Sequence, residues 1–147
     1  MSTSVDDVVH YLVATDADWI LDHVGAALGG PDVQWTVCRS GKEVRGAVAA
    51  ASVPVDAAFL DLQVGTMGGM AICLDLRLEE SGGRLPHVPV IMLLDRSADV
   101  FLAQRSAAEG WLIKPLDAIR LRRALRTVAG GGTYTEGVPS QPPVPTG

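Results

Sequence analysis

The chain has 147 residues, of which 48% are hydrophobic and 20% charged, a balance typical of one soluble globular domain. Its net charge of −5 argues against direct nucleic-acid binding, and no apolar run approaches the roughly 20 residues that cross a bilayer. Residues 1–7 are polar and acidic, unlike a signal peptide. Two cysteines, Cys38 and Cys73, are too few for a disulfide framework. We therefore expect reduced thiols, a cytoplasmic location and no membrane partner.

Five short apolar runs divide the chain between residues 8 and 129, and an amphipathic segment follows each run. The runs are nearly continuous in hydrophobicity, which is typical of strands buried on both faces of a parallel sheet. We expect strands at residues 8–14, 33–38, 57–60, 88–94 and 111–113. We expect helices at residues 19–28, 42–51, 70–80, 99–108 and 117–128.

Apolar spacing and capping residues predict the details of these helices. In the third helix, Met70, Leu74 and Leu78 fall on one face and are expected to point inward. Ser40 and Glu43 have the spacing of a capping box, in which each side chain bonds the backbone amide of the other at a helix start. The second helix is therefore expected to begin there.

Five successive βα units predict a flavodoxin-like three-layer α/β sandwich with a five-stranded parallel sheet, because parallel strands need right-handed crossover helices. This domain is expected to span residues 8–129. Residues 130–147 begin with three glycines, and four of the nine prolines lie in the last nine residues. Such a segment favours a flexible tail, whose removal should leave the thermal midpoint almost unchanged.

Polar residues follow the predicted strands, at the edge where proteins of this architecture bind ligands. Asp16 follows the first strand, Asp61 the third and Lys114 the fifth. Asp16 and Asp61, with one backbone carbonyl, supply the oxygen ligands that Mg²⁺ prefers. A carboxylate can also attack phosphorus to form an acyl phosphate, with metal and ammonium charges neutralising the transferred group.

This ordered set resembles the receiver domains of bacterial two-component response regulators, over roughly residues 8–128. The bias towards arginine and the absence of asparagine also hint at a GC-rich bacterial genome. In that family the phosphate-accepting aspartate ends the third strand, the position of Asp61, and a Lys-Pro pair, usually joined by a cis bond, matches Lys114-Pro115. The resemblance implies that Asp61 and Lys114 carry the chemistry and that Asp16, Asp61 and the Gln63 carbonyl bind Mg²⁺.

The chain departs from the family at two important positions. Thr15 replaces the first acid of the metal-binding pair, so Mg²⁺ binding is expected to be weak, with the Thr15 hydroxyl at most positioning a metal-bound water. Leu94 replaces the hydroxyl residue that bonds the phosphoryl group. The switch that couples this position to the aromatic at Trp111 should therefore be lost. Arg96 either supplies the missing donor or is simply solvated.

The resemblance implies an atypical single-domain response regulator, phosphorylated on Asp61 by a histidine kinase or phosphotransfer protein. It would catalyse its own phosphorylation and slow dephosphorylation but turn over no metabolite. The chain ends too soon for a DNA-binding domain, so we expect a protein output partner. The family also implies a possible homodimer through the last helix, which carries Arg120, Arg122, Arg123 and Arg126.

Two alternatives remain open from the sequence. One is a phosphorylation-independent interaction module that binds a cytoplasmic protein or enzyme complex, as the substitutions at Thr15 and Leu94 suggest. The other is an α/β protein that binds a small molecule.

Overall fold

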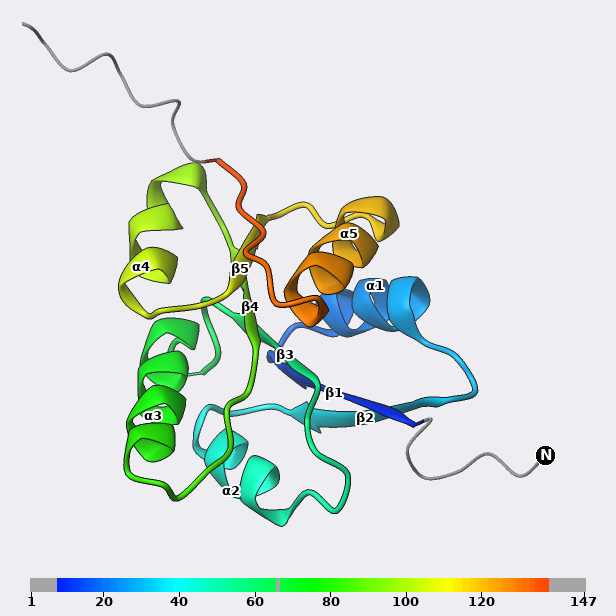
Figure 1. Ribbon diagram of the computed structural model, residues 1–147. Coiled ribbons are helices and arrows are strands. Elements are labelled where there is room, and N and C mark those ends of the chain that lie inside the picture. The colour runs from blue at the N-terminus through cyan, green and yellow to red at the C-terminus, as the bar shows by residue number, and fades with distance from the viewer. Residues whose placement is uncertain (1–7, 66, 138–147) are drawn as a thin grey trace, which may run out of the picture.

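The computed structural model describes residues 8–65 and 67–137 and confirms the flavodoxin-like fold. A five-stranded parallel sheet with the order β2-β1-β3-β4-β5 forms the middle layer. Helices α1 and α5 cover one face, and α2, α3 and α4 cover the other (Figure 1). Residues 1–7 and 138–147, which carry the expectations about a signal peptide and a proline-rich tail, lie outside the described residues.

Most element bounds fall within one or two residues of those predicted. The strands are β1 (Val9–Ala14), β2 (Val33–Cys38), β3 (Ala57–Asp61), β4 (Val90–Leu94) and β5 (Gly110–Ile113). The helices are α1 (Asp18–Leu28), α2 (Lys42–Ala50), α3 (Gly69–Ser81), α4 (Val100–Arg105) and α5 (Ala118–Ala129). The fourth helix is shorter than expected. A 3-10 turn (Ser97–Asp99) precedes it, and Ala107, with φ of 62°, lies in the left-handed region that ends it.

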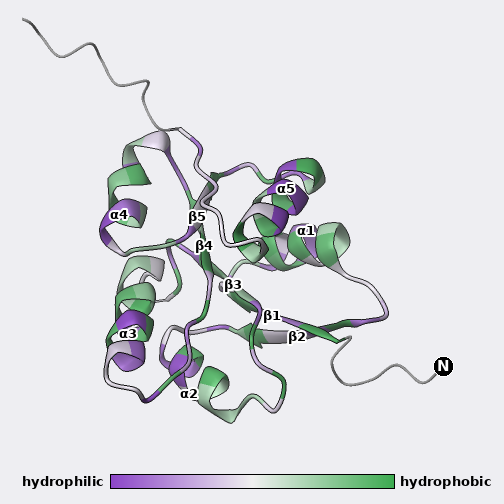
Figure 2. Cartoon of the chain, viewed as in Figure 1, coloured by the Kyte–Doolittle hydropathy of each residue, from purple (hydrophilic) through white to green (hydrophobic). Residues whose placement is uncertain are grey.

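Apolar side chains on both faces of the sheet form the core, as the continuous runs predicted. Every residue of β3 and β4 is buried. Leu12 and Leu60 pack towards α2 and α3, whereas Val13 and Phe59 pack towards α1 and α5. Figure 2 shows this apolar centre with hydrophilic residues on the outer turns of the helices. The helices thus hold the ends of the central strands in fixed positions.

The inward face of α3 was predicted wrongly. The buried residues are Gly69, Ile72, Cys73 and Leu76, whereas Leu74 and Leu78 are 44% and 63% exposed. The reason lies at the start of the helix, where Gly69 packs directly on the end of β3. A Cβ at Gly69 would lie only 2.5 Å from the carbonyl oxygen of Asp61. This close approach sets the rotation of the helix and turns the predicted stripe away from the core.

The predicted capping box before α2 is also wrong. The N-cap of this helix is Gly41, which has no side chain to offer. The Glu43 amide donates to the Ser40 carbonyl in a backbone turn, and the Glu43 carboxylate accepts from the Arg39 amide at 3.3 Å. The backbone turn therefore begins the helix without the reciprocal side-chain bonds.

The rotation of α3 can be tested with two leucines on the same helix. Leu76→Ala should lower the free energy of unfolding by about 2–5 kcal/mol, because it leaves a cavity in the core. Leu78→Ala should change it by less than about 0.5 kcal/mol, because Leu78 faces solvent. Urea denaturation of both variants measures the difference. Equal losses would contradict the observed orientation of the helix.

Residues 130–137 pack against the domain, which corrects the expectation that a flexible tail begins at residue 130. The Gly132 amide donates to the Thr127 carbonyl at 2.9 Å, and Tyr134 packs against the core between the sheet, α1 and α5. The prediction rested on the glycine-rich composition and did not consider Tyr134 and Glu136, whose side chains anchor this segment. Truncation after Ala129 should therefore lower the thermal midpoint.

Both cysteines are buried free thiols, as expected. Burial, helped by the nearby charge of Glu43, raises the pKa of Cys38 to about 11. Burial also raises the pKa of Cys73. The thiols are therefore protonated and unreactive at neutral pH. None of the helices in the described part of the chain is long and apolar enough to span a membrane.

Candidate functional site

The carboxyl ends of β1, β3, β4 and β5 bring four side chains together: Thr15, Asp61, Asp95 and Lys114. Asp61, the last residue of β3, is only 2% exposed. The Lys114 Nζ lies 2.6 Å from Asp61 Oδ1 and 2.8 Å from Asp95 Oδ1. On the other side, the Thr15 hydroxyl donates to Asp61 Oδ2 at 2.7 Å. The arrangement is a buried carboxylate held between an ammonium and a hydroxyl.

Backbone contacts between neighbouring strands position this carboxylate and its lysine. The Gln63 amide donates to Asp61 Oδ1 at 3.3 Å, so the loop after β3 bends back over the carboxylate. The Lys114 amide donates to the Leu94 carbonyl at 2.8 Å, which places the lysine directly beyond β5. The Lys114-Pro115 peptide bond is cis, as the resemblance implied.

Lys114 carries the positive charge of the site. Burial lowers its pKa, but the hydrogen bonds and charges of Asp61 and Asp95 outweigh that effect and raise the pKa above that of a free lysine. The ammonium also lies 5.9 Å from the centre of the Trp19 ring, within the range of a cation–π contact. Lys114 is therefore protonated at neutral pH and faces the Asp61 carboxylate.

Asp95 belongs to this site, although the sequence analysis did not select it. It directly follows β4, so its place at a strand end was the available signal. Its Oδ1 bonds Lys114, whereas its Oδ2 is buried and has no hydrogen-bond partner among the described residues. Asp61 and Asp95 therefore share one ammonium, and these three side chains together carry one formal negative charge in excess.

The predicted metal ligands lie at the same edge, but the donor set is small. Asp16 is exposed, and its Oδ2 accepts from the Gly65 amide at 3.1 Å. Within residues 8–65 and 67–137, no group of three or more His, Cys, Asp or Glu is arranged to hold a metal. The two carboxylates, with the Gln63 carbonyl, are oxygen donors of the kind that Mg²⁺ accepts. Because Thr15 brings no charge, this set suits weak binding.

The two positions predicted to form the switch lie in the same part of the core. Leu94 is fully buried and belongs to the same apolar cluster as Trp111, which is 4% exposed. The Trp111 indole donates to the Glu136 carbonyl at 2.9 Å. Arg96 pairs with Asp99 at 3.3 Å, and its side chain is 75% exposed. Of the two alternatives for Arg96, the geometry favours the solvated side chain.

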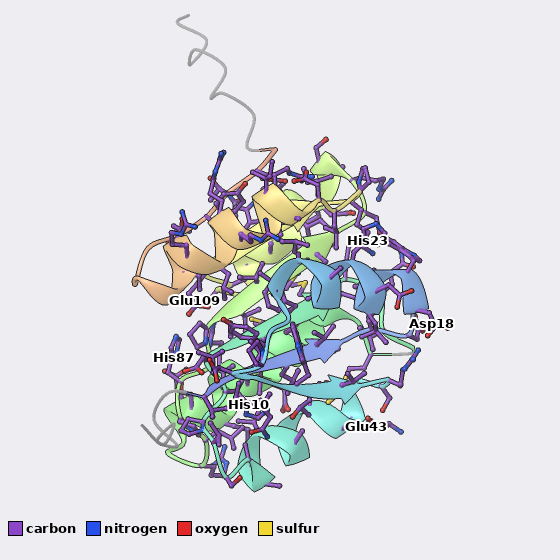
Figure 3. The ribbon with its side chains drawn as sticks, turned by 90° about the vertical axis from the view of Figure 1, so that its right-hand side faces the viewer. His10, Asp18, His23, Glu43, His87 and Glu109 are labelled. Atoms are coloured by element: carbon purple, nitrogen blue, oxygen red, sulfur yellow. The ribbon has the colours of Figure 1, made fainter. Side chains whose placement is uncertain are left out.

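A charged cluster around His87 lies apart from this site. His87 contacts Glu80 and Glu109 at 2.8 and 2.7 Å. Figure 3 places His87 and Glu109 at the end of the molecule opposite Asp18 and His23. This cluster therefore ties the α3–β4 connection to the start of β5 and takes no part in the Asp61 site.

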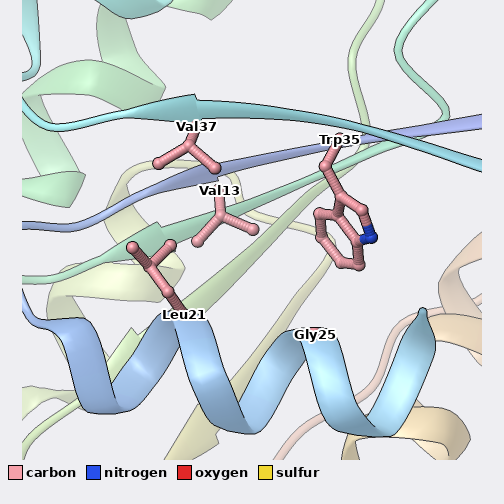
Figure 4. Close-up of a pocket in the computed structure, with 5 residues that line it drawn as sticks. All are labelled: Val13, Leu21, Gly25, Trp35 and Val37. Carbon is pink, nitrogen blue, oxygen red and sulfur yellow. The ribbon is translucent and has the colours of Figure 1, made fainter.

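An apolar groove lies between α1 and the edge strand β2, away from Asp61. Its lining residues are Val13, Leu21, Gly25, Trp35 and Val37 (Figure 4). Its volume of about 200 Å³ is below the roughly 300–1,000 Å³ typical of ligand pockets. The groove gives little support to the small-molecule alternative.

Solved receiver domains share this fold. The signal receiver domain of a signal transduction histidine kinase from Syntrophus aciditrophicus is 20% identical, with a TM-score of 0.72 over 95% of this chain and 98% of that chain. A chemotaxis response regulator of Vibrio cholerae is 20% identical, with a TM-score of 0.70 over 82% and 98% of the two chains.

A third receiver domain, from a sensor histidine kinase of Pseudomonas aeruginosa, has a magnesium ion coordinated in its active-site cleft. It is 20% identical, with a TM-score of 0.67 over 84% of this chain and 98% of that chain. No protein-family model and no curated protein matches the sequence. The chain therefore has the receiver-domain fold, and its chemistry must be argued from its own site.

Proposed function

We propose that this chain is an atypical response regulator that accepts a phosphoryl group on Asp61 from a histidine kinase or phosphotransfer protein. The observation that supports this function best is the buried Asp61 carboxylate beside the Lys114 ammonium at 2.6 Å. A structural aspartate in this position would need neither the burial nor the cation at a strand end where ligands bind. The output would be contact with a protein partner.

In the proposed reaction, an Asp61 oxygen attacks the phosphorus of a phosphohistidine. A P–O bond forms, the P–N bond breaks, and the leaving imidazole takes a proton from solvent. Lys114 neutralises charge on the phosphoryl oxygens, which is the main way proteins catalyse phosphoryl transfer. Thr15 holds the carboxylate in place through its hydroxyl. The chain would thus catalyse only its own modification and the slow hydrolysis that reverses it.

Mg²⁺ is the cofactor that these residues would hold. Asp16, Asp61 and the Gln63 carbonyl are the donors, and the bound ion would neutralise further charge on the phosphoryl oxygens. The excess negative charge of the site supports a cation there. The replacement of an acid by Thr15 supports a weak interaction.

A second candidate is a phosphorylation-independent interaction module. Asp95 supports it, because this carboxylate already occupies Lys114 and would repel an incoming phosphoryl group. Leu94, buried where the family has a hydroxyl, supports it as well. In this case the receiver fold would bind its partner through its surface alone.

Incubation with acetyl phosphate and Mg²⁺ separates the two candidates. The response-regulator function predicts that intact-mass measurement will detect one added phosphoryl group, lost in Asp61→Asn. Asp22→Asn, an exposed aspartate on α1, is the matched control and should retain the modification. An unmodified protein, or modification that persists in Asp61→Asn, would favour the interaction module.

Thr15→Asp should tighten Mg²⁺ binding roughly ten-fold, because the number of carboxylates sets the affinity of such sites. Without metal, the new carboxylate would lie against Asp61 and lower stability, and Mg²⁺ should restore it. A Mg²⁺ titration followed by NMR near residues 16 and 61 measures the affinity. Thr133→Asp, on the surface, controls for the added charge. Unchanged affinity in Thr15→Asp would contradict this ligand assignment.

A further inference from the structure

β5 forms one edge of the sheet, and residues 133–137 run along its outer side between α4 and α5 (Figure 1). An edge strand otherwise leaves a row of backbone groups open to another chain. Here the Trp111 amide donates to the Tyr134 carbonyl at 2.9 Å, and the Tyr134 amide donates to the Glu109 carbonyl at 3.1 Å. Gly110 and Tyr134 thereby form a parallel bridge. The segment adds a short piece of strand to the sheet.

Glu136 anchors this segment through both its side chain and its backbone. Its carboxylate accepts from the Ile113 amide at 3.0 Å, from Arg120 Nε at 2.8 Å and from the Tyr134 hydroxyl at 2.7 Å. Its carbonyl accepts from the Trp111 indole. In a regular parallel pair, the Ile113 amide would donate to a backbone carbonyl of the added strand. Here it donates to the Glu136 carboxylate instead. The Glu136 side chain is accordingly only 16% exposed.

Arg120, the cation that binds Glu136, is held in place by the backbone of the domain. Arg120 Nη2 donates to the Ile113 carbonyl at 2.8 Å, and Nη1 donates to the Pro115 carbonyl at 2.7 Å. These bonds fix the guanidinium plane independently of the segment. A planar guanidinium in a fixed position favours a carboxylate that binds it through two oxygens. The edge of β5 is therefore shaped to recognise an acidic residue.

The segment pairs with the edge of the sheet over a short stretch only, and its main anchors are Tyr134 and Glu136. Its only strand-like pairing among the described residues is the single bridge of Tyr134, and Thr133 and Thr135 are exposed. Three glycines, residues 130–132, join it to α5, and Gly131 has a φ of +89°, a left-handed conformation suited to glycine. The glycines give the chain conformational freedom between α5 and the segment. The segment can therefore leave the edge, once the Glu136 contacts are broken, without unfolding α5.

We propose that the outer edge of β5, with Arg120, is a docking site for an extended acidic peptide, and that residues 133–137 are its built-in occupant. The occupant defines the partner's chemistry: an extended chain parallel to β5 with an aromatic residue and, two positions later, a carboxylate. Such addition of a strand at a sheet edge is a common mode of peptide recognition. A partner protein would bind by displacing the segment. The proposal does not depend on phosphorylation of Asp61.

The first test opens the site in the full-length chain. Glu136→Ala should speed hydrogen exchange of the Ile113 amide and the Trp111 indole at least ten-fold. The Ile113 amide loses its carboxylate acceptor, and the indole loses the residue 136 carbonyl when the released segment leaves the edge. Thr135→Ala, the exposed neighbour, should leave both rates unchanged. The Leu62 amide, which bonds the Leu93 carbonyl between β3 and β4, monitors the core and should exchange equally slowly in all versions. Unchanged rates in Glu136→Ala would overturn the proposal.

The second test supplies the occupant from outside. A synthetic peptide of residues 132–137, Gly-Thr-Tyr-Thr-Glu-Gly, is added at millimolar concentration to the Glu136→Ala chain. It should restore slow exchange at Ile113 and Trp111, and the same peptide with Glu136→Gln should not. The peptide should not bind the unaltered chain, because the chain's own tethered segment occupies the edge at a high effective concentration and outcompetes it. Failure of the peptide to restore protection would overturn the docking site.

Sedimentation of the Glu136→Ala chain provides the remaining check. A monomer that binds the peptide supports a site for a partner's extended segment. A dimer that excludes the peptide would instead assign the exposed edge to a second copy of this chain and overturn the proposal. Because none of these three measurements uses a phosphoryl donor, their failure would leave the proposed reaction at Asp61 untouched.

Discussion

Lys114→Met should lower the free energy of unfolding by about 3–5 kcal/mol, the cost typical of removing one partner from a buried ion pair. The Asp61 and Lys114 side chains are 3% and 13% exposed, so water cannot replace the lost ammonium. Asp95, about one-third exposed, would add a screened repulsion. The same variant should lose acyl-phosphate formation, because no other cation in the described structure faces Asp61. Chemical denaturation and intact-mass measurement test the two effects.

Lys42→Met provides a matched control, because Lys42 is the only other lysine and lies exposed on α2. It should change stability by less than about 0.5 kcal/mol. The double variant Asp61→Asn with Lys114→Met should recover part of the loss, because the charge left without a partner is removed. Equal losses in the two lysine variants would contradict the role of Lys114 as the buried counter-ion.

The raised pKa of Lys114 predicts the sign of a pH dependence. The native state holds the Lys114 proton more tightly than the unfolded chain does. Its stabilising contribution is therefore complete below about pH 10.5 and is lost as the pH rises through the higher native pKa. Lys114→Met should lack this part of the alkaline loss of stability. The slope of stability against pH above 10.5 in the two proteins measures it.

Asp95→Asn should speed acyl-phosphate formation at Asp61 roughly ten-fold or more. Two unit charges 4 Å apart interact with about 4 kcal/mol at a dielectric constant near 20, and each 1.36 kcal/mol removed from a barrier is ten-fold in rate. Solvent screening of Asp95 reduces this repulsion energy, so we expect a rate increase nearer ten-fold than the thousand-fold that about 4 kcal/mol would give. Removing its charge also frees Lys114 for the incoming phosphoryl group. The initial rate with acetyl phosphate and Mg²⁺ is the measurement.

Asp18→Asn removes the same charge from an aspartate whose side chain is 82% exposed and paired with Arg39. Its rate should match that of the unaltered protein. A rate in Asp95→Asn that equals this control would show that Asp95 does not restrain the reaction. Reaction in neither protein would instead argue against phosphorylation of Asp61 altogether.

The order of strands and helices, and two residues at the centre of the candidate site, could be predicted from the amino-acid sequence alone. Buried parallel strands can be recognised in the sequence, because strands covered on both faces are apolar along their whole length. Asp61 and Lys114 could be selected because the ends of parallel strands meet at one edge of the sheet. Thr15 and Leu94 could likewise be recognised as departures, because strand-end positions are countable along the chain.

The contacts between residues far apart in the chain could be identified only from the folded structure. The close packing of Gly69 on Asp61 rotated α3 away from its apparent apolar stripe. Asp95 joined the site because Lys114, 19 residues later, reaches it across β4 and β5. Glu136 bonds both the edge of β5 and Arg120, two segments that come together only in the folded domain. Local propensity and spacing carry no record of such contacts, because these depend on how distant segments come together in space.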